Sequence, residues 1–513
     1  MNFKDAAAIQ SVVWALRLGE YPRSLNRSKI AELFDGFPPF SADEERDNGL
    51  AVNVNFLSAT RLAHDARNQY TNAFCKSGTY FTARTDTGPV HKRQERGSIV
   101  TREINRIMQG CPLYFENLRS KFAQLVLYGI APSAWENIEK WCPDSISVSE
   151  VLIPSNTLLS FRNLPFFAVM RSYTAMELYN LTHGPKVDPA WNIPMADALL
   201  KWADQQTASL TGTNWPQVWN PTAWEQRMKE NNGLYASDSV PTIEVADFFF
   251  FHDDGKQSGW RRRLVVDQYG QPGVNGVVPE KRMDGVPDEF LYNPGDRIYG
   301  NGLNQIIHFA FADLSAVAPF RYHAVRGLGF LLFAVCHLQN RLRCKFNEAV
   351  FENLIMLLRV RSLEEAERAL KINLINRGIV DETVQFIPPT ERWQVNAQLA
   401  EMGLQENERL IQENMSGYRQ DTNRSSDGVE RTAFQIRSEL EAATALISAA
   451  LLQAYKYEEQ SYEEIFRRFC IKNSRDPDVR IFQARCLQAG VPEKMLTPEA
   501  WELQSSRDRK SVV

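Results

Sequence analysis

Few side chains in this sequence have the types and the spacing that catalysis or metal binding requires. Asp253 and Asp254, with Asp267 further along, are carboxylates that could hold a divalent metal ion for chemistry on nucleic acid. The run Asp253–Asp254–Gly255 is also typical of a tight turn, because Asp and Gly adopt the backbone conformations that turns need. The turn is the favoured interpretation, and the metal site is the alternative.

Histidine and cysteine come closest to a second cluster between residues 323 and 344. His323, His337, Cys336 and Cys344 share this stretch, but the two cysteines would lie roughly 80° apart on a helix. Because cysteine is routinely buried, we expect these thiols to be core residues. The 7 cysteines of the chain include no CxxC pair, which favours free thiols in a reducing compartment over a structural zinc site. We therefore predict no metal site and no cofactor.

The sequence motifs of common enzyme classes are missing. The chain has no GxxxxGK[ST] phosphate loop, no HExxH pair and no GxSxG elbow. We therefore expect neither catalytic residues nor enzymatic activity.

Basic residues gather in two places where binding is the expected chemistry. Arg261, Arg262 and Arg263 lie within a predicted strand, whose alternation turns the middle side chain to the opposite face. One face would bind an acidic group while the other packs or pairs, which fits a protein interface as well as nucleic acid. The second place is a predicted helix and loop that carries His91, Lys92, Arg93, Arg96, Arg102 and Arg106. A solvated helix face is the favoured interpretation there, and contact with a polyanion or an acidic partner is the alternative.

The longest predicted element is a helix within residues 319–360, where apolar residues recur three or four positions apart. Val325 to Leu358 would form a rod about 50 Å long. A small domain cannot cover such a rod, so we expect it to pack against long neighbours or against other copies of the chain.

The elements before the rod are of two kinds. Residues 1–130 are predicted to be mostly helical, and residues 145–170 contain short strands. Residues 242–318 are predicted to form a small β module with long loops, inserted between helices, in which a hairpin turns at Asp254–Gly255.

After the rod, two long helices are predicted over residues 391–415 and 429–470. The polar segment between them, residues 417–430, is longer than two antiparallel helices need. We interpret it either as a loop with a role of its own or as an exposed hairpin tip.

Composition limits the class of protein further. The 513 residues predict about two to four domains. The 58 basic and 62 acidic side chains nearly balance, so the chain lacks the basic footprint of a protein that coats duplex DNA. The longest uncharged apolar run, Leu328–Cys336, is far too short to span a membrane, and no signal-peptide pattern opens the sequence. We expect a soluble, intracellular-type protein.

One run of residues opens the last long helix: Glu430-Arg-Thr-Ala-Phe-Gln-Ile-Arg437, continuing to Glu439-Leu440. In the portal (head-to-tail connector) proteins of tailed bacteriophages, a Thr-Ala-x-[EQ]-[IV] segment starts the long helix just after the tunnel loop. Weaker matches are NVNFL at 53–57, LVLYG at 125–129 and FIPPT at 386–390. Together with the order of elements over most of the chain, these runs resemble that family, most closely its short-tailed podovirus type.

The resemblance implies an α+β, mainly α, portal fold with long stem and wing helices and an inserted small β-rich clip domain. The implied parts are an N-terminal wing (1–205), a linker with the first stem helix near 221–233 (206–241), the clip (242–318), the second stem helix (319–347), a wing with the tunnel loop at about 417–427 (348–430), and C-terminal wing or crown helices (431–513).

The resemblance also implies the function. About twelve subunits would form a ring at one capsid vertex, with a channel through which double-stranded DNA is packaged and ejected. The implied partners are the terminase large subunit, head–tail adaptor and tail proteins, and the major capsid and scaffolding proteins, with no membrane. The ring would assemble in the host cytoplasm and remain in the virion.

The candidate site residues are carried over position by position. The tunnel-loop candidates are Tyr418, Arg419, Gln420, Asn423 and Arg424; the stem-channel candidates are Arg341, Arg343 and Lys345; the clip-interface candidates are Arg261, Arg262 and Arg263. Two other hypotheses remain open: a metal-dependent enzyme that processes nucleic acid, and a helical structural adaptor of a virion without a channel.

Overall fold

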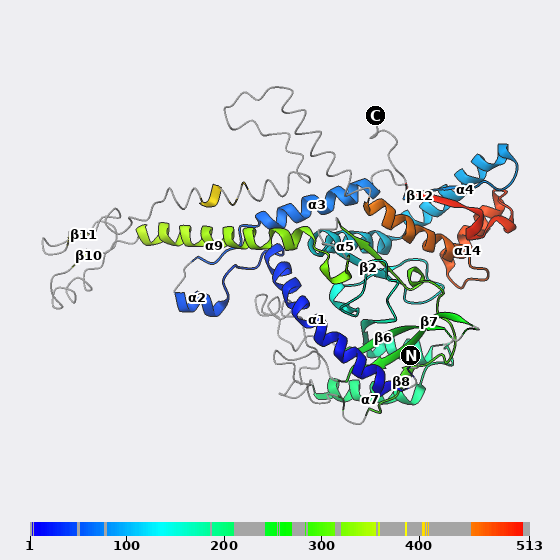
Figure 1. Ribbon diagram of the computed structural model, residues 1–513, viewed down its shortest axis with the longest axis horizontal. Coiled ribbons are helices and arrows are strands. Elements are labelled where there is room, and N and C mark those ends of the chain that lie inside the picture. Colours follow the sequence, from blue (N-terminus) through cyan, green and yellow to red (C-terminus); the bar gives the residue numbers. More distant parts are fainter. Residues whose placement is uncertain are drawn as a thin grey trace, which may run out of the picture. The chain divides into compact units, whose positions relative to one another are not determined.

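The computed structural model describes residues 3, 5–48, 52–75, 80–184, 187–209, 242–253, 255, 257–268, 283, 286–312, 320–354, 358–359, 385–386, 403–405, 407, 409 and 453–505. Helices and strands both contribute to the described residues, and helix is the larger share (Figure 1), which confirms the predicted α+β, mainly α, class. The chain divides into two compact units. The first comprises Met1–Glu32, Ala63–Leu331 and Gly417–Val513, and the second comprises Leu33–Leu62 and Leu332–Ser416.

The helices and strands follow one another along most of the chain. The helices in the described residues include α1 (Ala6–Phe34), α2 (Ala42–Asn48), α3 (Ser58–Cys75), α4 (Val90–Gln109), α5 (Pro112–Tyr128), α6 (Ala175–His183), α7 (Ile193–Ser209), α9 (Leu328–Leu354), α14 (Pro477–Gln488) and a helix over residues 453–469. The strands are β1 (Phe81–Arg84), β2 (Ile130–Ala134), β3 (Asp144–Ser145), β4 (Val151–Leu152), β5 (Phe166–Thr174), β6 (Thr242–Asp253), β7 (Ser258–Val266), β8 (Phe290–Tyr292), β9 (Ile307–Phe311), β10 (Leu358–Arg359), β11 (Gln385–Phe386) and β12 (Glu502–Ser505). Within these described residues, no helix is both long and apolar enough to cross a membrane.

The largest sheet has five strands in the order β4-β5-β6-β7-β8. β6 and β7 form the predicted antiparallel hairpin, with Val245 opposite Val266 at one end and Asp253 opposite Ser258 at the other. Gly255 has φ +76°, and the Asp253 carboxylate accepts a hydrogen bond from its backbone N–H at 3.0 Å. The turn interpretation of Asp253 and Gly255 is therefore confirmed.

The strands within residues 242–318 differ from the expected separate β module. β6 pairs along its whole length with β5, and β9 pairs with β2, so these strands complete sheets that residues 130–174 begin. The reason lies in β6 itself, whose nearly unbroken apolar run from Val245 to Phe250 is buried on both faces. Such a run belongs in the middle of a sheet, with a partner strand on each edge.

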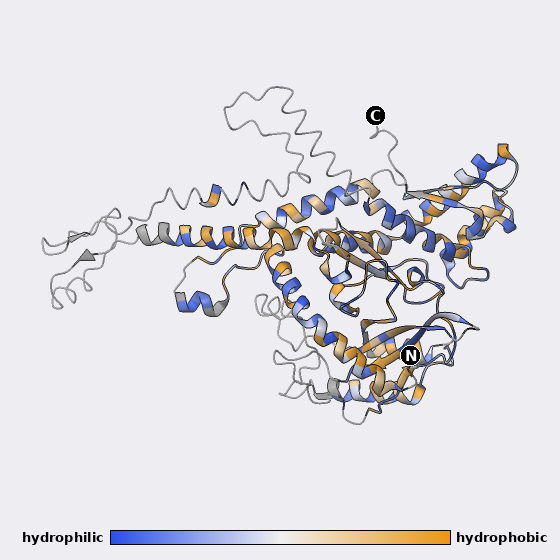
Figure 2. Cartoon of the chain, in the orientation of Figure 1, coloured by the Kyte–Doolittle hydropathy of each residue, from blue (hydrophilic) through white to orange (hydrophobic). Residues whose placement is uncertain are grey.

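The five-stranded sheet is covered on both faces. On one face Ile9 and Val13 of α1 pack against Phe248 and Phe250. The opposite face packs at one end against α6 and α7, and at the other end against the sheet β3-β2-β9. Figure 2 shows the apolar residues along these strands and along α1. Because both faces of the sheet are covered, the side chains on both faces of β6 are buried between Val245 and Phe250.

The predicted long helix is present as α9, which has 27 residues. It begins at Leu328 rather than at Val325, because Gly327 lies against Gly129 at the end of α5. A Cβ on Gly327 would stand 2.3 Å from the backbone N of Gly129, which itself has φ +78°. Two glycines are therefore needed where these backbones touch.

A second core joins the N-terminal helices to the C-terminal ones. Phe74 of α3 packs on Phe122 of α5 with ring centroids 5.2 Å apart. Trp141 contacts Phe469 at 5.2 Å, and Phe469 in turn contacts Phe482 of α14 at 5.2 Å. The helix over residues 453–469 is thus fixed between segments from both ends of the sequence.

Candidate functional site

The three candidate arginines of β7 all have partners within the chain. Arg261 and Arg263 are each only 7% exposed, and they point to the opposite face from Arg262, as the predicted alternation requires. Arg261 pairs with Asp296 at 2.5 Å, and Arg263 donates to the carbonyl oxygen of Gly295 at 2.7 Å. With internal partners and little exposed surface, these two side chains are poorly placed to bind a partner.

Arg262 is held by a buried carboxylate. Its Nε and Nη2 donate to the two oxygens of Asp247, each at 2.7 Å, and the guanidinium lies 5.2 Å from the ring centroid of Tyr299. Burial alone would lower the pKa of Arg262, but Asp247 and Tyr299 hold that pKa above its ordinary value. A bidentate pair of this kind positions strands β6 and β7 relative to each other.

The stem-channel candidates lie on α9 beside the segment that carries α2. Arg341 stands 4.5 Å from the ring centroid of Phe40 and pairs with Glu44 at 3.2 Å. Arg343 stands 5.7 Å from the ring of Phe56, and Lys345 is an exposed residue 5.7 Å from the ring of Phe40. Aromatic rings therefore hold all three cations, and Lys345 remains open to solvent.

The tunnel-loop candidates Tyr418, Arg419, Gln420, Asn423 and Arg424 lie outside the described residues, as do the predicted first stem helix at 221–233 and the run from Glu430 to Leu440.

The carboxylates of the alternative metal site are far apart. Asp253 ends β6 at the turn, whereas Asp267 follows β7 at the opposite end of the hairpin. Since the ladder between them advances about 3.3 Å per residue, one metal ion cannot bridge both. Asp267 instead pairs with Arg17 of α1, and Asp254 lies outside the described residues. Among the described residues, no group of three His, Cys, Asp or Glu side chains could hold a metal ion.

The His323–Cys344 stretch also contains core residues. Cys336 and Cys344 have no exposed surface, and burial raises the pKa of the Cys336 thiol to about 12. His323 contacts the carbonyl oxygen of Ile153 at 3.0 Å, and His337 stacks on Phe333. The predicted burial of the two thiols is confirmed, and a thiol with so high a pKa is a poor nucleophile.

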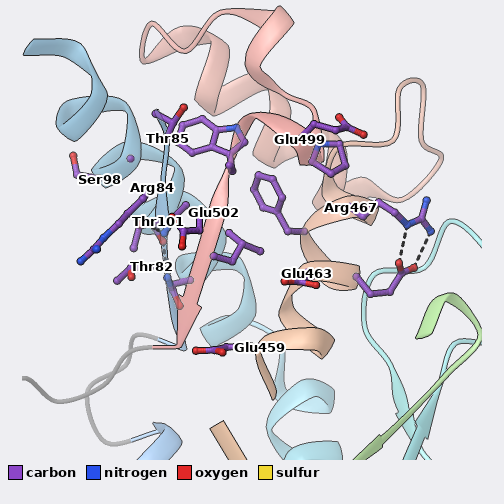
Figure 3. Close-up of a pocket in the computed structure, with 18 of the residues that line it drawn as sticks. Thr82, Arg84, Thr85, Ser98, Thr101, Glu459, Glu463, Arg467, Glu499 and Glu502 are labelled. Carbon is purple, nitrogen blue, oxygen red and sulfur yellow. Dashed lines mark hydrogen bonds and ion pairs between the residues drawn. The ribbon is translucent and has the colours of Figure 1, made fainter. Parts of the chain in front are cut away.

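A groove in the first unit brings together polar and charged side chains from several elements. It has a volume of about 2060 Å³ and is lined by α4, the β1–β12 ribbon, the helix over residues 453–469 and residues 498–501. Figure 3 shows side chains from these elements facing one another across it. The groove exceeds the roughly 300–1,000 Å³ of most small-molecule pockets, which favours a polymer as its ligand.

Close packing of α4 on β1 builds one side of the groove. Gly97 permits the approach, because a Cβ there would lie 2.8 Å from the carbonyl oxygen of Ala83. Thr101 and Asn105 then bond the strand: Thr101 Oγ1 accepts from the N–H of Ala83 at 2.8 Å, and Asn105 Nδ2 donates to the carbonyl of Phe81 at 2.9 Å. The helix thus covers one edge of β1 with side-chain hydrogen bonds.

The two sides of the groove differ in their predominant charge. β1 and α4 contribute Arg84, Arg93, Arg102 and Arg106. The other side contributes Glu459, Glu463 and Glu464 from the helix over residues 453–469, Glu499 from the segment before β12, and Glu502 from β12 itself. Glu464 is engaged by Arg467, and hydrogen bonding to that carboxylate raises the pKa of Arg467. The carboxylates repel phosphate, so the mixture favours a polypeptide over nucleic acid.

The sequence pattern marked the basic residues on one side of this groove, for which a solvated helix face was the favoured interpretation. The basic run from His91 to Arg106 was visible, and its Arg93, Arg102 and Arg106 line the groove. Glu459 and Glu463 carry the i,i+4 spacing of one helix face, which is the signal that could have marked them. Nothing in the sequence showed that this face lies opposite α4.

Comparison with known protein families and with curated proteins found no match for this chain.

Proposed function

We propose that this chain is a portal protein: copies of it close into a ring at a capsid vertex, through which double-stranded DNA is packaged and ejected. The ring would also be the docking platform for terminase and for tail or adaptor proteins. The proposal starts from the resemblance of the Glu430–Leu440 run and of the element order to portal proteins.

The observation that carries the proposal is an exposed stripe on α9. Leu331, Leu338 and Lys345 are exposed at intervals of seven residues, and Leu338 is 49% exposed. Leu331, in the first turn of the same helix, is 54% exposed. A heptad stripe with exposed leucines is the pattern by which long helices pack laterally against one another. In the proposed ring, this stripe of α9 would pack against a neighbouring copy of the chain.

Native mass spectrometry and negative-stain imaging of the purified protein test the proposal. A closed ring with an axial hole wide enough for duplex DNA is expected. Leu338→Glu should prevent ring closure while the subunit remains folded by circular dichroism, because a carboxylate cannot be buried unpaired at the interface. Leu487→Glu on α14 is the matched control, since Leu487 is 46% exposed and should be neutral. A protein that stays monomeric or dimeric contradicts the proposal.

The segment from 417 to 427 gives a second test, which rests on the sequence alone. Deleting residues 417–427 should leave ring assembly intact but impair DNA packaging or retention, because the resemblance assigns the DNA contact to this segment. If the deleted protein no longer assembles, the segment has a structural role instead.

A further inference from the structure

One edge of β12, at the groove, has no paired strand within the part of the chain that the structure describes. Among the described residues, β1 and β12 form a sheet of two strands, in which Ala83 lies opposite Leu503 and Arg84 lies opposite Glu502. α4 already covers the outer edge of β1, so the outer edge of β12 is the place where this ribbon can add a strand.

The hydrogen bonds of β1 show which backbone groups face that edge. In an antiparallel strand the N–H and C=O of one residue point to the same side. Phe81 and Ala83 point to α4, because they bond Asn105 and Thr101. Thr82 and Arg84 therefore point to β12, and the register turns the backbone of Leu503 away from β1.

Carboxylates stand beside the same edge. Figure 3 shows Glu459 and Glu463 next to β12, on the side from which the helix over residues 453–469 approaches it, with Glu499 at the upper end of the view. Glu463 and Glu499 have no ion-pair partner among the described residues. Arg467, the cation on this side of the groove, is already bound to Glu464 through two hydrogen bonds of 2.7 and 2.8 Å. A ligand that runs along this edge meets negative charge.

We propose that this groove binds an extended polypeptide segment by strand addition to β12, and that the segment carries lysine or arginine at alternate positions. Main-chain hydrogen bonds to Leu503 would fix the strand, while alternate side chains reach Glu459, Glu463 and Glu499. A free sheet edge accepts an extended peptide of many sequences, so the carboxylates supply the preference for basic side chains. This interface does not depend on the proposed ring.

Fluorescence anisotropy with a labelled Thr-Lys-Val-Lys-Val-Lys-Thr peptide tests the proposal on the full-length chain. Binding is expected at low salt and should weaken as salt is added. Glu459→Gln combined with Glu463→Gln should weaken binding about tenfold, since each lost ion pair at a solvated site contributes a factor of a few. Arg102→Gln combined with Arg106→Gln, on the other side of the groove, is the matched control and should not weaken it.

Two backbone-methylated peptides separate strand addition from charge attraction alone. N-methylation of the alternate residues that face β12 removes the donors and should abolish binding, whereas N-methylation of the other set should preserve it. The proposal is overturned if both methylated peptides bind like the parent peptide, or if the double glutamine variant binds the parent peptide unchanged. It is also overturned if a peptide with glutamate in place of each lysine binds equally well. Because the assay measures one subunit and one peptide, its result is independent of whether a ring forms.

Discussion

Arg468 is the most completely buried cation among the described residues, with no exposed surface. Its Nη1 donates to the carbonyl oxygens of Asn137 at 2.6 Å and Lys140 at 2.7 Å, and its Nη2 donates to that of Gln305 at 2.9 Å. Its Nε bonds Glu464 at 2.7 Å. One side chain therefore satisfies backbone groups of two loops and ties both to a C-terminal helix.

Arg468→Met should lower the free energy of unfolding by about 3 kcal/mol, because three buried carbonyl oxygens lose their donors. Chemical denaturation measures the change. Arg467→Met is the control: Arg467 is 30% exposed on its side chain and bonds only Glu464 among the described residues, so its loss should cost less than about 1 kcal/mol. Equal losses for the two variants would contradict the role given to Arg468.

We expect His308 to make the stability of the chain depend on pH. It has no exposed surface, and the ammonium of Lys121 lies 3.4 Å from its Nδ1. Lys121 itself pairs with Glu458 at 2.5 Å, and the backbone of Tyr457 also faces the ring. Burial, and then the Lys121 charge, lower the pKa of His308 well below its ordinary value of 6.5.

Because the folded chain holds His308 neutral, the unfolded chain takes up the proton first as the pH falls. The contribution of neutral His308 to the free energy of unfolding is complete above pH 6.5. Below pH 6.5 this contribution declines, with a slope of up to about 1.4 kcal/mol per pH unit. Denaturation series between pH 8 and pH 5 should show this decline, and His308→Gln should flatten it. His91→Gln, at an exposed site on α4, should leave the slope unchanged. Parallel pH profiles for the wild type and His308→Gln would contradict the assignment.

At the scale of elements, the contact that starts α9 is the most sensitive point of the backbone. Gly327→Ala should destabilise the chain by about 2–3 kcal/mol, because the new methyl group would meet the backbone of Gly129 and neither can yield. Gly302→Ala is the control, since its Cβ would meet nothing within 4 Å, and its effect should stay within about 0.5 kcal/mol. Thermal unfolding of the two variants compares them. A neutral Gly327→Ala would mean that α5 and α9 can separate at this point.

Among the described residues, helices were predictable from the sequence, and sheet partners were not. The helix pattern and its terminal signals are local: α5 begins at Pro112 and ends before Gly129, and α14 begins at Pro477 behind its cap Asp476. The β6–β7 hairpin was equally local, with its turn at Gly255. The pairing of β5 with β6 joins segments far apart in the chain, and such pairing depends on what packs on each face. This is why residues 242–318 looked like a module of their own.

The candidate sites were likewise predictable only where they depend on local sequence. A cluster of arginines in a strand indicated binding, but the structure gives Arg261, Arg262 and Arg263 partners of their own within the chain. Composition could not reveal this, since Asp247 and Asp296 are ordinary acids in the sequence. The groove between α4 and the helix over residues 453–469 depends on a contact across most of the chain, which no periodicity shows.

At the scale of the whole molecule, net charge distinguishes a protein through which DNA passes from a protein that binds DNA tightly. Twelve copies at −4 each would carry about −48 in the proposed ring, so duplex DNA inside should be repelled overall and held only at a few basic points. We expect purified protein to retain duplex DNA only weakly at 150 mM salt in anisotropy measurements, and to leave it uncut in the presence of Mg²⁺. Nanomolar binding with a steep salt dependence would contradict the conduit, because many phosphate contacts would brake sliding. Cleavage that requires Mg²⁺ would favour the enzyme hypothesis instead, and its metal ligands would then have to include residues other than the pair Asp253 and Asp267, which lie at opposite ends of one hairpin.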